Sequence, residues 1–474
     1  MVGSPLVLGI DSSTQSTKAV LVDSADGTLV EERTAAHPPG TAVDPRAWLA
    51  ALDQVTGPLL ARAAAVAVGG QQHGMVALDA QGEPAHEALL WNDLRSAGAA
   101  AELVEEVGGA ARCAELTGSV FIASYTITKL RWLRVHRPDV VDQIQDVMLP
   151  HDYLTWQLTG RADAPTTDRG DASGTGYWSP SEDAWLPGLF EQALGRGARL
   201  PRIAGVREVV GSTADDVSVG PGTGDNMAAA LGLDLRAGDV SVSIGTSGVA
   251  SMVTTEPVAD GTGALSGFAD ATGGFLPLAC TVNAARILSV GARLLGVDHA
   301  GLAALALESV PGANGLTLLP YLDGERTPAR PEATGTLHGL TSATTRADLA
   351  RAHVEGLLFS LADAVDALAA VSGRRPERLL LIGGAARNPA VRALAPLVFD
   401  APIVLPHPAE YVALGAARQA AWAYSGDEQP PEWAVATTDL SPPQPLAGLR
   451  DDYALLRERT ATWSDQRPRT KGTS

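Results

Sequence analysis

The sequence predicts an α/β protein built from two domains. Its 474 residues exceed what one hydrophobic core usually fills, so two domains of about 200 residues each are expected. Strand-like and helix-like apolar patterns alternate along the chain, which is typical of sheets whose strands are joined through helices. A pattern of strand, Gly/Ser/Thr-rich turn and strand occurs near the start and again about 230 residues later. Each half of the chain therefore begins in the same way.

The first half is predicted to open as a β-meander and to continue as a helical layer. Short apolar runs predict strands over residues 5–10, 19–23, 28–36, 64–70 and 75–79. Helical spacing of apolar residues predicts helices over residues 45–65, 93–107 and 125–156. We place the first domain at residues 1–233.

The second domain, residues 234–474, repeats the strand signals before a long helical stretch. Strands are expected over 239–245, 248–254 and 378–384, and helices over 345–371 and 388–400. From about residue 464 the chain is polar, so a loose tail is expected there.

Composition and charge exclude several classes of function. The chain has 54 acidic against 35 basic residues, and a net charge of −19 disfavours a nucleic-acid-binding surface. No signal peptide is recognisable, and no apolar run reaches the roughly 20 residues that cross a bilayer. Cys113 and Cys280 are far apart, so neither a disulfide framework nor a cysteine metal site is expected. We expect a cytoplasmic protein that binds neither nucleic acid nor membrane.

The two repeated turns lie in LGIDSSTQSTKAVLVD (8–23) and VSIGTSGVASMV (242–253). Each offers backbone N–H groups and hydroxyls, which are the donors that hold phosphates. Such residues also form ordinary hairpin turns, so either turn alone favours the simpler interpretation. Their duplication favours phosphate binding. The chain lacks a P-loop, a Rossmann glycine motif after its first strand, a zinc-protease motif and a hydrolase nucleophile elbow.

Seven short motifs give the sequence a specific resemblance. They are GIDSSTQSTK (9–18), GGQQHG (69–74), WNDLR (91–95), GTGDN (222–226), SIGTSG (243–248), LPYLDGERTP (319–328) and LIGGAARNP (381–389). In this order and spacing, which runs through residues 6–424, the chain resembles the FGGY family of carbohydrate kinases. The resemblance implies two ribonuclease-H-like domains of the actin-like ATPase fold around a central cleft that closes on sugar and ATP.

The implied activity is transfer of a phosphoryl group from ATP to a sugar, with Mg²⁺ as cofactor. The resemblance is strongest to members that convert D-xylulose to D-xylulose 5-phosphate. Sister kinases that act on ribulose, a gluconate-type acid or glycerol are the alternative. A non-enzymatic actin-like ATPase or chaperone would share the phosphate turns, but it would have no use for the QQH, WND and GDN motifs. The sequence does not decide whether the protein forms a homodimer.

Two aspartates match the catalytic positions of the family. Asp225 matches the general base that takes the proton of the attacking hydroxyl. Asp also begins helices well, so an N-cap role is the structural alternative, and both roles can hold. Asp11 matches the acid that places magnesium through water, whereas an Asx turn is its alternative. Asp11 is followed by Ser12 and then Ser13-Thr14, where the family usually has Gly-Thr.

Further positions follow from the same motifs. The expected phosphate and adenosine contacts are Ser13, Thr14 and Lys18 in the first turn, Gly245, Thr246 and Ser247 in the second, and Gly383, Gly384 and Asn388 beyond it. Lys18 could instead be a strand-end charge, and Asn388 is expected to cap a helix as well.

The sugar ligands are expected among Gln72, His73, Asn92, Asp93 and Asn226, because telling one sugar from another needs directional hydrogen bonds. His73 could instead be a surface-loop residue, and Asp93 the cap of the following helix. Gln72 replaces a methionine that is common in the family.

Overall fold

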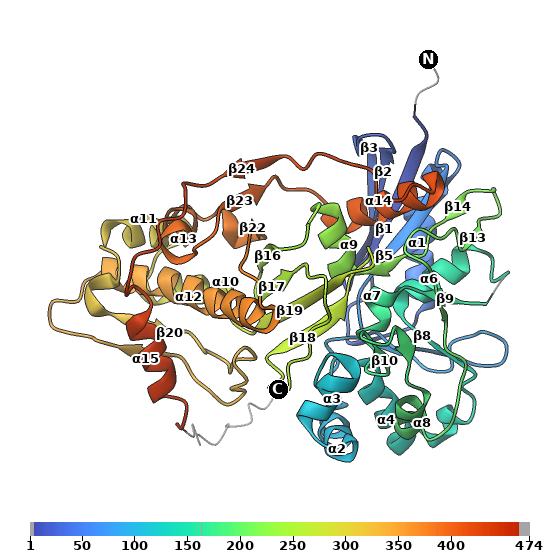
Figure 1. The fold of residues 1–474 in the computed structure, drawn as a ribbon, viewed down its shortest axis with the longest axis horizontal. Coiled ribbons are helices and arrows are strands. Elements are labelled where there is room, and N and C mark those ends of the chain that lie inside the picture. Colours follow the sequence, from blue (N-terminus) through green and yellow to red (C-terminus); the bar gives the residue numbers. More distant parts are fainter. Residues whose placement is uncertain (1–3, 163, 464–474) are drawn as a thin grey trace. The chain divides into compact units, whose positions relative to one another are not determined.

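The computed structural model describes residues 4–162 and 164–463, so the predicted loose tail lies outside the described residues. The chain divides into two compact units (Figure 1). The first unit contains the chain up to Arg236 together with Val253–Pro277 and Pro408–Ala436. The second contains Ala237–Met252, Leu278–His407 and the chain from Thr437 onward. The division into domains 1–233 and 234–474 stays a prediction.

The sheet of the first unit has the order β13-β14-β5-β1-β2-β3, and β15 also pairs with β5. Its strands are β1 (Leu6–Ser12), β2 (Ser16–Asp23), β3 (Leu29–Ala36), β5 (Ala65–Gly70), β13 (Gly211–Ser212), β14 (Ser218–Val219) and β15 (Thr223–Gly224). β1 runs antiparallel to β2 and parallel to β5, and β5 runs parallel to both β14 and β15. The carboxyl ends of β1, β5 and β15 therefore lie side by side.

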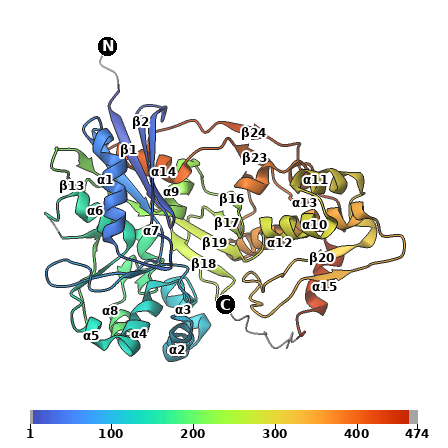
Figure 2. The ribbon, with the colours of Figure 1, turned by 180° about the vertical axis from the view of Figure 1, so that it is seen from behind.

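Two helices cover the two faces of this sheet, which explains why β1 reads as a continuous apolar run. Helix α1 (Arg46–Leu60) packs on one face, where Trp48 contacts the core that contains Leu8. Helix α14 (Tyr411–Ser425) packs on the other, where Ala417 lies in the core that contains Val7. Figure 2 shows the strands of this unit between the two helices.

Helix α14 approaches its neighbours so closely that two glycines are required. A Cβ on Gly9 of β1 would lie 1.9 Å from the carbonyl oxygen of Ala413. A Cβ on Gly415 would lie 1.8 Å from the carbonyl oxygen of Ala228 in helix α9 (Asp225–Gly232). Both distances are far below van der Waals contact, so any larger residue would separate the backbones. The packing of α14 on β1 and α9 therefore fixes the helix that begins at Asp225.

The rest of the first unit is made of shorter elements, and one expectation about them was wrong. The elements are β4 (Ala42–Val43), β6 (Val76–Leu78), β7 (Ala88–Leu89), α2 (Ala97–Val107), α3 (Ala110–Thr117), α4 (Thr126–His136), α5 (Pro138–Val141), β8 (Asp146–Met148), α6 (Pro150–Leu158), β9 (Thr166–Thr167), α7 (Arg169–Ala172), β10 (Trp178–Ser179), β11 (Ala184–Trp185), α8 (Pro187–Leu194), β12 (Arg202–Ile203) and β18 (Leu265–Ala269). The helix predicted over 125–156 is three helices and a strand. Pro138 and Pro150 each begin a new helix, and β8 between them pairs with β6.

The second seven-stranded sheet has the order β18-β19-β17-β16-β22-β23-β24. The elements of the second half are β16 (Asp239–Ile244), β17 (Gly248–Met252), β19 (Phe275–Thr281), α10 (Ala285–Leu295), α11 (His299–Glu308), β20 (Thr317–Leu319), β21 (Thr336–His338), α12 (Arg346–Ser372), β22 (Arg378–Ile382), α13 (Pro389–Val398), β23 (Ile403–Pro406), β24 (Thr437–Asp439) and α15 (Asp451–Arg459). β16 runs antiparallel to β17 and parallel to β22, just as β1 does to β2 and β5. The predicted repeat is therefore present.

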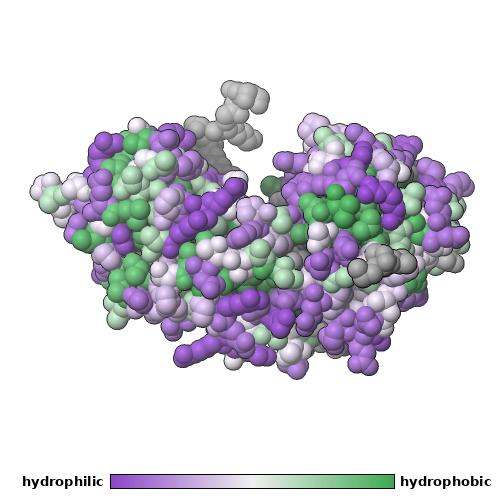
Figure 3. Space-filling model, turned by 90° about the horizontal axis from the view of Figure 1, so that it is seen from above, coloured by the Kyte–Doolittle hydropathy of each residue, from purple (hydrophilic) through white to green (hydrophobic). Residues whose placement is uncertain are grey.

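Within the described parts of the chain, no single helix is long and apolar enough to cross a membrane. The bent pair α10 and α11 reaches the required length and composition only together, with 85° between the two helices. Hydrophilic and hydrophobic residues are interspersed over the face seen in Figure 3.

Candidate functional site

Three strand ends bring the predicted catalytic and sugar-binding residues of the first unit together. Asp11 of β1 lies opposite Gly69 of β5, and Gly224 of β15 lies opposite Gly70. The chain leaves β5 toward Gln72 and leaves β15 at Asp225. In open α/β sheets, ligands bind beyond the carboxyl ends of parallel strands. This edge of the first sheet is therefore the candidate site.

Asp225 is the first residue of α9. The N-cap of that helix is Gly224, without a side-chain capping bond, so the N-cap interpretation of Asp225 was wrong. The Oδ1 atom of Asp225 accepts hydrogen bonds from the backbone N–H of Asn226 at 2.8 Å and from its Nδ2 at 3.2 Å. Burial, followed by the negative charges of Asp11 and Asp171, raises the pKa of Asp225 to about 7. A carboxyl poised near neutral pH is suited to accept a proton.

Asp11 is buried near the end of β1, within the strand rather than in a turn as its structural alternative required. Ser13, at the position where the family usually has the glycine, donates its hydroxyl to Oδ1 of Asp11. Burial raises the pKa of Asp11 to about 6, although the hydrogen bond from Ser13 and the charge of Lys18 oppose the rise. Lys18 itself donates a hydrogen bond to Glu410, just before α14. Its contact with phosphate stays a prediction.

Gln72 and Asn226 form a polar pair beside Asp225. Nδ2 of Asn226 donates to Oε1 of Gln72 at 2.8 Å. Nε2 of Gln72 is buried and has no hydrogen-bond partner among the described residues. A buried donor without an acceptor costs about 1–3 kcal/mol, so a ligand hydroxyl at this position would remove a penalty.

His73 is held in a defined orientation rather than lying loosely on the surface. Its backbone has a positive φ of 66°, and the ring is partly buried. Nδ1 lies 2.7 Å from the carbonyl oxygen of Gly174, so Nδ1 carries the proton and donates it to that carbonyl. The ring centroid lies 4.8 Å from that of Tyr125 and 5.6 Å from that of Phe268. The surface-loop interpretation of His73 was therefore wrong. These two aromatic neighbours were not predicted, because they follow the motif by about 50 and 195 residues.

Within the WNDLR motif, Asp93 is a structural anchor. Its oxygens accept from Thr41 at 2.7 Å and from Nε of Arg95 at 2.8 Å. Burial would favour the neutral acid, but the hydrogen bonds from Arg95 and Thr41 hold its pKa below the ordinary value. The N-cap of α2 is Ser96, so the expectation that Asp93 caps the following helix was wrong. A sugar contact of Asp93 would compete with these bonds and stays a prediction.

The two residues before Asp93 face different partners. Oδ1 of Asn92 is buried without a hydrogen-bond partner among the described residues, which leaves an acceptor for a ligand. Nε1 of the exposed Trp91 donates to the hydroxyl of Thr14 at 2.9 Å. This bond links the WNDLR motif to the turn between β1 and β2, and no sequence pattern indicates it.

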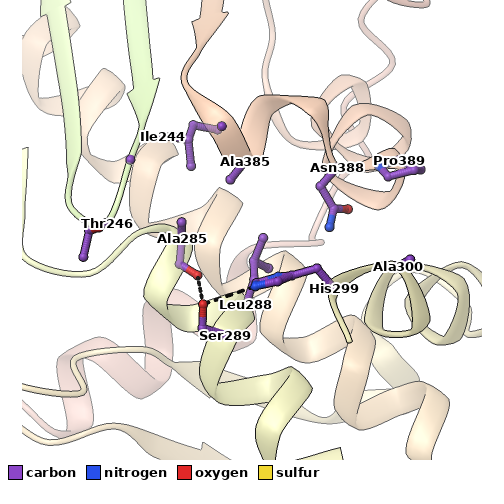
Figure 4. Close-up of a pocket in the computed structure, with 12 residues that line it drawn as sticks. Ile244, Thr246, Ala285, Leu288, Ser289, His299, Ala300, Ala385, Asn388 and Pro389 are labelled. Carbon is purple, nitrogen blue, oxygen red and sulfur yellow. Dashed lines mark hydrogen bonds between the residues drawn. The ribbon is translucent and has the colours of Figure 1, made fainter. Parts of the chain in front are cut away.

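A pocket of about 520 Å³ lies within the second unit. Its lining residues are Ile244, Gly245, Thr246, Ala285, Leu288, Ser289, His299, Ala300, Gly384, Ala385, Asn388 and Pro389. Figure 4 shows apolar side chains around much of the space, with the amide of Asn388 directed toward it. The volume and the mainly apolar lining suit the adenosine part of a nucleotide. Gly245, Thr246, Gly384 and Asn388, which belong to two separate motifs of the sequence, thus come together.

Other expected contacts lie near this pocket without lining it. Gly383 has a φ of 90°, and a Cβ there would lie 2.8 Å from the carbonyl oxygen of Ile244. The hydroxyl of Ser247 donates to the carbonyl of Val282 at 3.3 Å. The cap predicted at Asn388 is confirmed, since its Oδ1 accepts from the N–H groups of Ala390 and Val391 at 2.9 and 3.3 Å. Ser289 and His299 on α10 and α11 were missed because neither lies in a motif.

The family is decided by two domain matches. The N-terminal domain of the FGGY family of carbohydrate kinases matches residues 6–234, and the C-terminal domain of the same family matches residues 240–424. The chain belongs to the FGGY family of carbohydrate kinases. The predicted family and the mixed α/β, actin-like ATPase fold are thereby confirmed. An FGGY kinase is a sugar phosphotransferase, which excludes the non-enzymatic ATPase considered above.

The FGGY relatives are similar over almost the whole chain. A protein of Streptomyces coelicolor named xylulose kinase is 44% identical, over 98% of this chain and 97% of its own length. Xylulose kinase of Escherichia coli is 32% identical over 81% of this chain and 82% of its own. The crystal structure of xylulose kinase from Bifidobacterium adolescentis has a TM-score of 0.92 and 42% identity, covering 96% of this chain and 99% of that one.

Proposed function

We propose that the chain catalyses the ATP-dependent phosphorylation of D-xylulose to D-xylulose 5-phosphate. The observation that carries the proposal is the group formed by Asp225, Asn226 and Gln72 at one sheet edge, where a carboxyl with a pKa of about 7 lies beside an amide donor without a protein acceptor among the described residues. The relatives named xylulose kinase support this choice of sugar.

In this mechanism Asp225 is the general base. Its ionised carboxylate takes the proton from the sugar hydroxyl as the hydroxyl oxygen attacks the γ-phosphate. Asn226 donates two hydrogen bonds that keep Oδ1 in place. Nε2 of Gln72, the His73 ring and Oδ1 of Asn92 bind other sugar oxygens and so select the hydroxyl that reaches the base. Water competes poorly because it cannot make all of these contacts.

The residues of the first unit fit a magnesium ion. Asp11 and Asp225 are hard oxygen ligands, and the charge of Asp11 raises the pKa of Asp225 when no cation lies between them. Asp11 would hold the ion through water. When bound, Mg²⁺ would neutralise phosphate charge. A cation would also lower the pKa of Asp225 and keep it ionised as a base.

ATP binds through its adenosine part in the pocket of the second unit. Gly384 lets the nucleotide approach the backbone, and the amide of Asn388 lies at the pocket edge. Thr246, in the turn between β16 and β17, is the donor we assign to the γ-phosphate, together with Gly245 and Ser247. Ser13 and Thr14 are assigned to the phosphates from the first turn. The cytoplasmic location and a homodimer stay predictions.

A coupled assay of ADP release tests the substrate. Purified protein is given MgATP and a panel containing D-xylulose, D-ribulose, glycerol and gluconate. D-xylulose is expected to have the highest kcat/KM. A higher kcat/KM for D-ribulose or glycerol would overturn the assignment in favour of a sister kinase, and ADP release independent of any sugar would remove the kinase mechanism itself.

A further inference from the structure

A buried cluster of one histidine and three aspartates lies behind the candidate site. His151 is the second residue of α6, and its side chain is fully buried. Its Nδ1 lies 2.6 Å from Oδ2 of Asp171, and its Nε2 lies 3.2 Å from Oδ1 of Asp152. Oδ1 of Asp168 lies 3.9 Å from Nε2. All three carboxyl side chains are buried as well.

The ring of His151 is the cation facing these three acids. A buried carboxylate without a cation or hydrogen-bond donors is costly. Burial favours the neutral ring, but the charges of Asp152, Asp171 and Asp168 raise the pKa of His151 to about 9. Because carboxyl oxygens lie within 3.9 Å of both ring nitrogens, we assign the ring as an imidazolium. Tyr177, which is also buried near Asp152 and Asp171, stays protonated because burial raises its pKa.

His151, Asp152 and Asp171 are close enough to hold a metal ion, but the distance between Nδ1 of His151 and Oδ2 of Asp171 favours a hydrogen-bonded ion pair between these two residues. The 2.6 Å separation between Nδ1 and Oδ2 of Asp171 is that of a strong charge-assisted hydrogen bond. Two ligands of one tetrahedral metal ion are about 3.3 Å apart, given metal–ligand distances of about 2.0 Å.

The cluster supports the strand ends that carry the site. A Cβ on Gly70 would lie 2.7 Å from Cβ of His151, and one on Gly222 would lie 2.7 Å from its Cδ2. The backbone of β5 at Gly70 thus packs against the Cβ and backbone of His151, and the GTGDN loop at Gly222 packs against its imidazole ring. The hydroxyl of Thr223, two residues before Asp225, donates to Oδ2 of Asp168 at 2.7 Å.

We propose that His151 is a positioning residue for phosphoryl transfer, which acts as a buried counter-ion that holds Asp168 and Asp171 and, through Thr223 and Gly222, the loop that presents Asp225. The inference rests on the proposed function of Asp225. Without the imidazolium, the acids must take up protons or move apart, and either change weakens the hydrogen bond from Thr223 to Asp168 that anchors the loop.

Charge and hydroxyl variants test the role. His151→Gln is expected to lower kcat at least tenfold and to change KM for the sugar less than kcat. His151→Lys keeps a cation between the acids and is expected to recover most of the lost kcat. His353→Gln is the matched control, because His353 is a buried histidine of α12 whose Nδ1 bonds the carbonyl of Leu349. It is expected to lose similar thermal stability but to keep kcat within about twofold.

A second pair of variants covers the case in which His151→Gln does not fold. Thr223→Val removes the hydroxyl that bonds Asp168 at nearly the same volume, and is expected to lower kcat five- to twentyfold. Thr223→Ser keeps the hydroxyl and is expected to stay within twofold of the wild type. Equal kcat for the valine and serine variants, or a His151→Gln variant as active as His353→Gln, would overturn the positioning role.

Two measurements do not depend on the substrate. ¹⁵N NMR of the histidine rings is expected to show both nitrogens of His151 protonated up to about pH 8. A neutral ring at pH 7.5, or stoichiometric bound metal that elemental analysis finds in the wild type and not in His151→Gln, would overturn the role of His151 as a counter-ion. If Asp225→Asn kept full activity while His151→Gln lost it, the proposed base would fail and the cluster would act elsewhere. A failure of Asp225 as the general base can therefore be told apart from a failure of His151 as a positioning residue.

Discussion

Replacement of Asp225 by asparagine should impair catalysis and stabilise the protein at the same time. The amide is nearly isosteric with the carboxyl but cannot take a proton, so we expect kcat to fall at least about 100-fold. The stability effect follows from the pKa, which rises from its ordinary value of 3.8 to about 7 in the folded protein. Because the folded-state pKa is raised, ionisation of Asp225 opposes folding. The cost is absent below about pH 4 and fully present above pH 7.

The difference between these two pKa values corresponds to at most about 4 kcal/mol of folding free energy. Relative to the wild type, Asp225→Asn should therefore gain about 1–4 kcal/mol at pH 8, and the gain should vanish as the pH falls toward 4. Thermal midpoints are measured at pH 8, 6 and 4.5 without nucleotide or magnesium, since a cation near Asp11 would relieve the same repulsion. A gain of several degrees is expected at pH 8. A variant that is less stable at pH 8 and keeps tens of per cent of kcat would show that Asp225 merely begins its helix.

Substitutions at three further positions test separate parts of the structure. Gln72→Leu removes the unpaired amide donor and should raise KM for D-xylulose at least tenfold in steady-state assays, whereas Gln72→Glu should also weaken binding by placing a second carboxylate beside Asp225. Asn388→Ala should lower stability by about 1 kcal/mol through loss of the α13 cap and raise KM for ATP more than KM for sugar; an unchanged KM for ATP would limit Asn388 to capping. Gly9→Ala should destabilise the first unit by more than about 3 kcal/mol, because its Cβ would overlap the carbonyl of Ala413, and soluble protein with a wild-type melting midpoint would contradict the close packing of α14.

The sequence predicted the sheets better than the contacts between distant segments. The apolar run of β1 and the repeat at β16 could be predicted, because buried strands between helices have a recognisable composition. The helix over 125–156 was wrong because helical spacing outweighed Pro138 and Pro150, which begin new helices. Proline at a helix start is a local signal, so this break could have been predicted from the sequence.

Candidate site residues could be named from the sequence only where a motif matches the family. Asp11, Gln72 and Asp225 were named because their motifs match those of the FGGY family, and their roles stay predictions. His151 was not singled out, since a histidine before Asp152 and Tyr153 in an apolar helix reads as ordinary core. The role of His151 depends on its contacts with Asp168 and Asp171, and no periodicity in the sequence predicts that α7 packs near α6. Ion pairs between residues of different helices are therefore the part of the site that sequence patterns do not predict.

The two repeated hairpins differ in the residues at the end of their first strand, and this difference gives the two turns different chemistry. In the first hairpin β1 ends with Asp11 and Ser12, so a buried carboxyl lies near the end of the strand. In the second, β16 ends at Ile244 and the next residue is Gly245, so no side chain covers the backbone where the pocket begins. A carboxylate beside phosphate would repel it unless a cation lay between them, whereas a glycine lets N–H groups approach the anion directly. On the proposed function, the first turn places the cation and the second accepts the phosphate, and transfer of a charged phosphoryl group requires both roles.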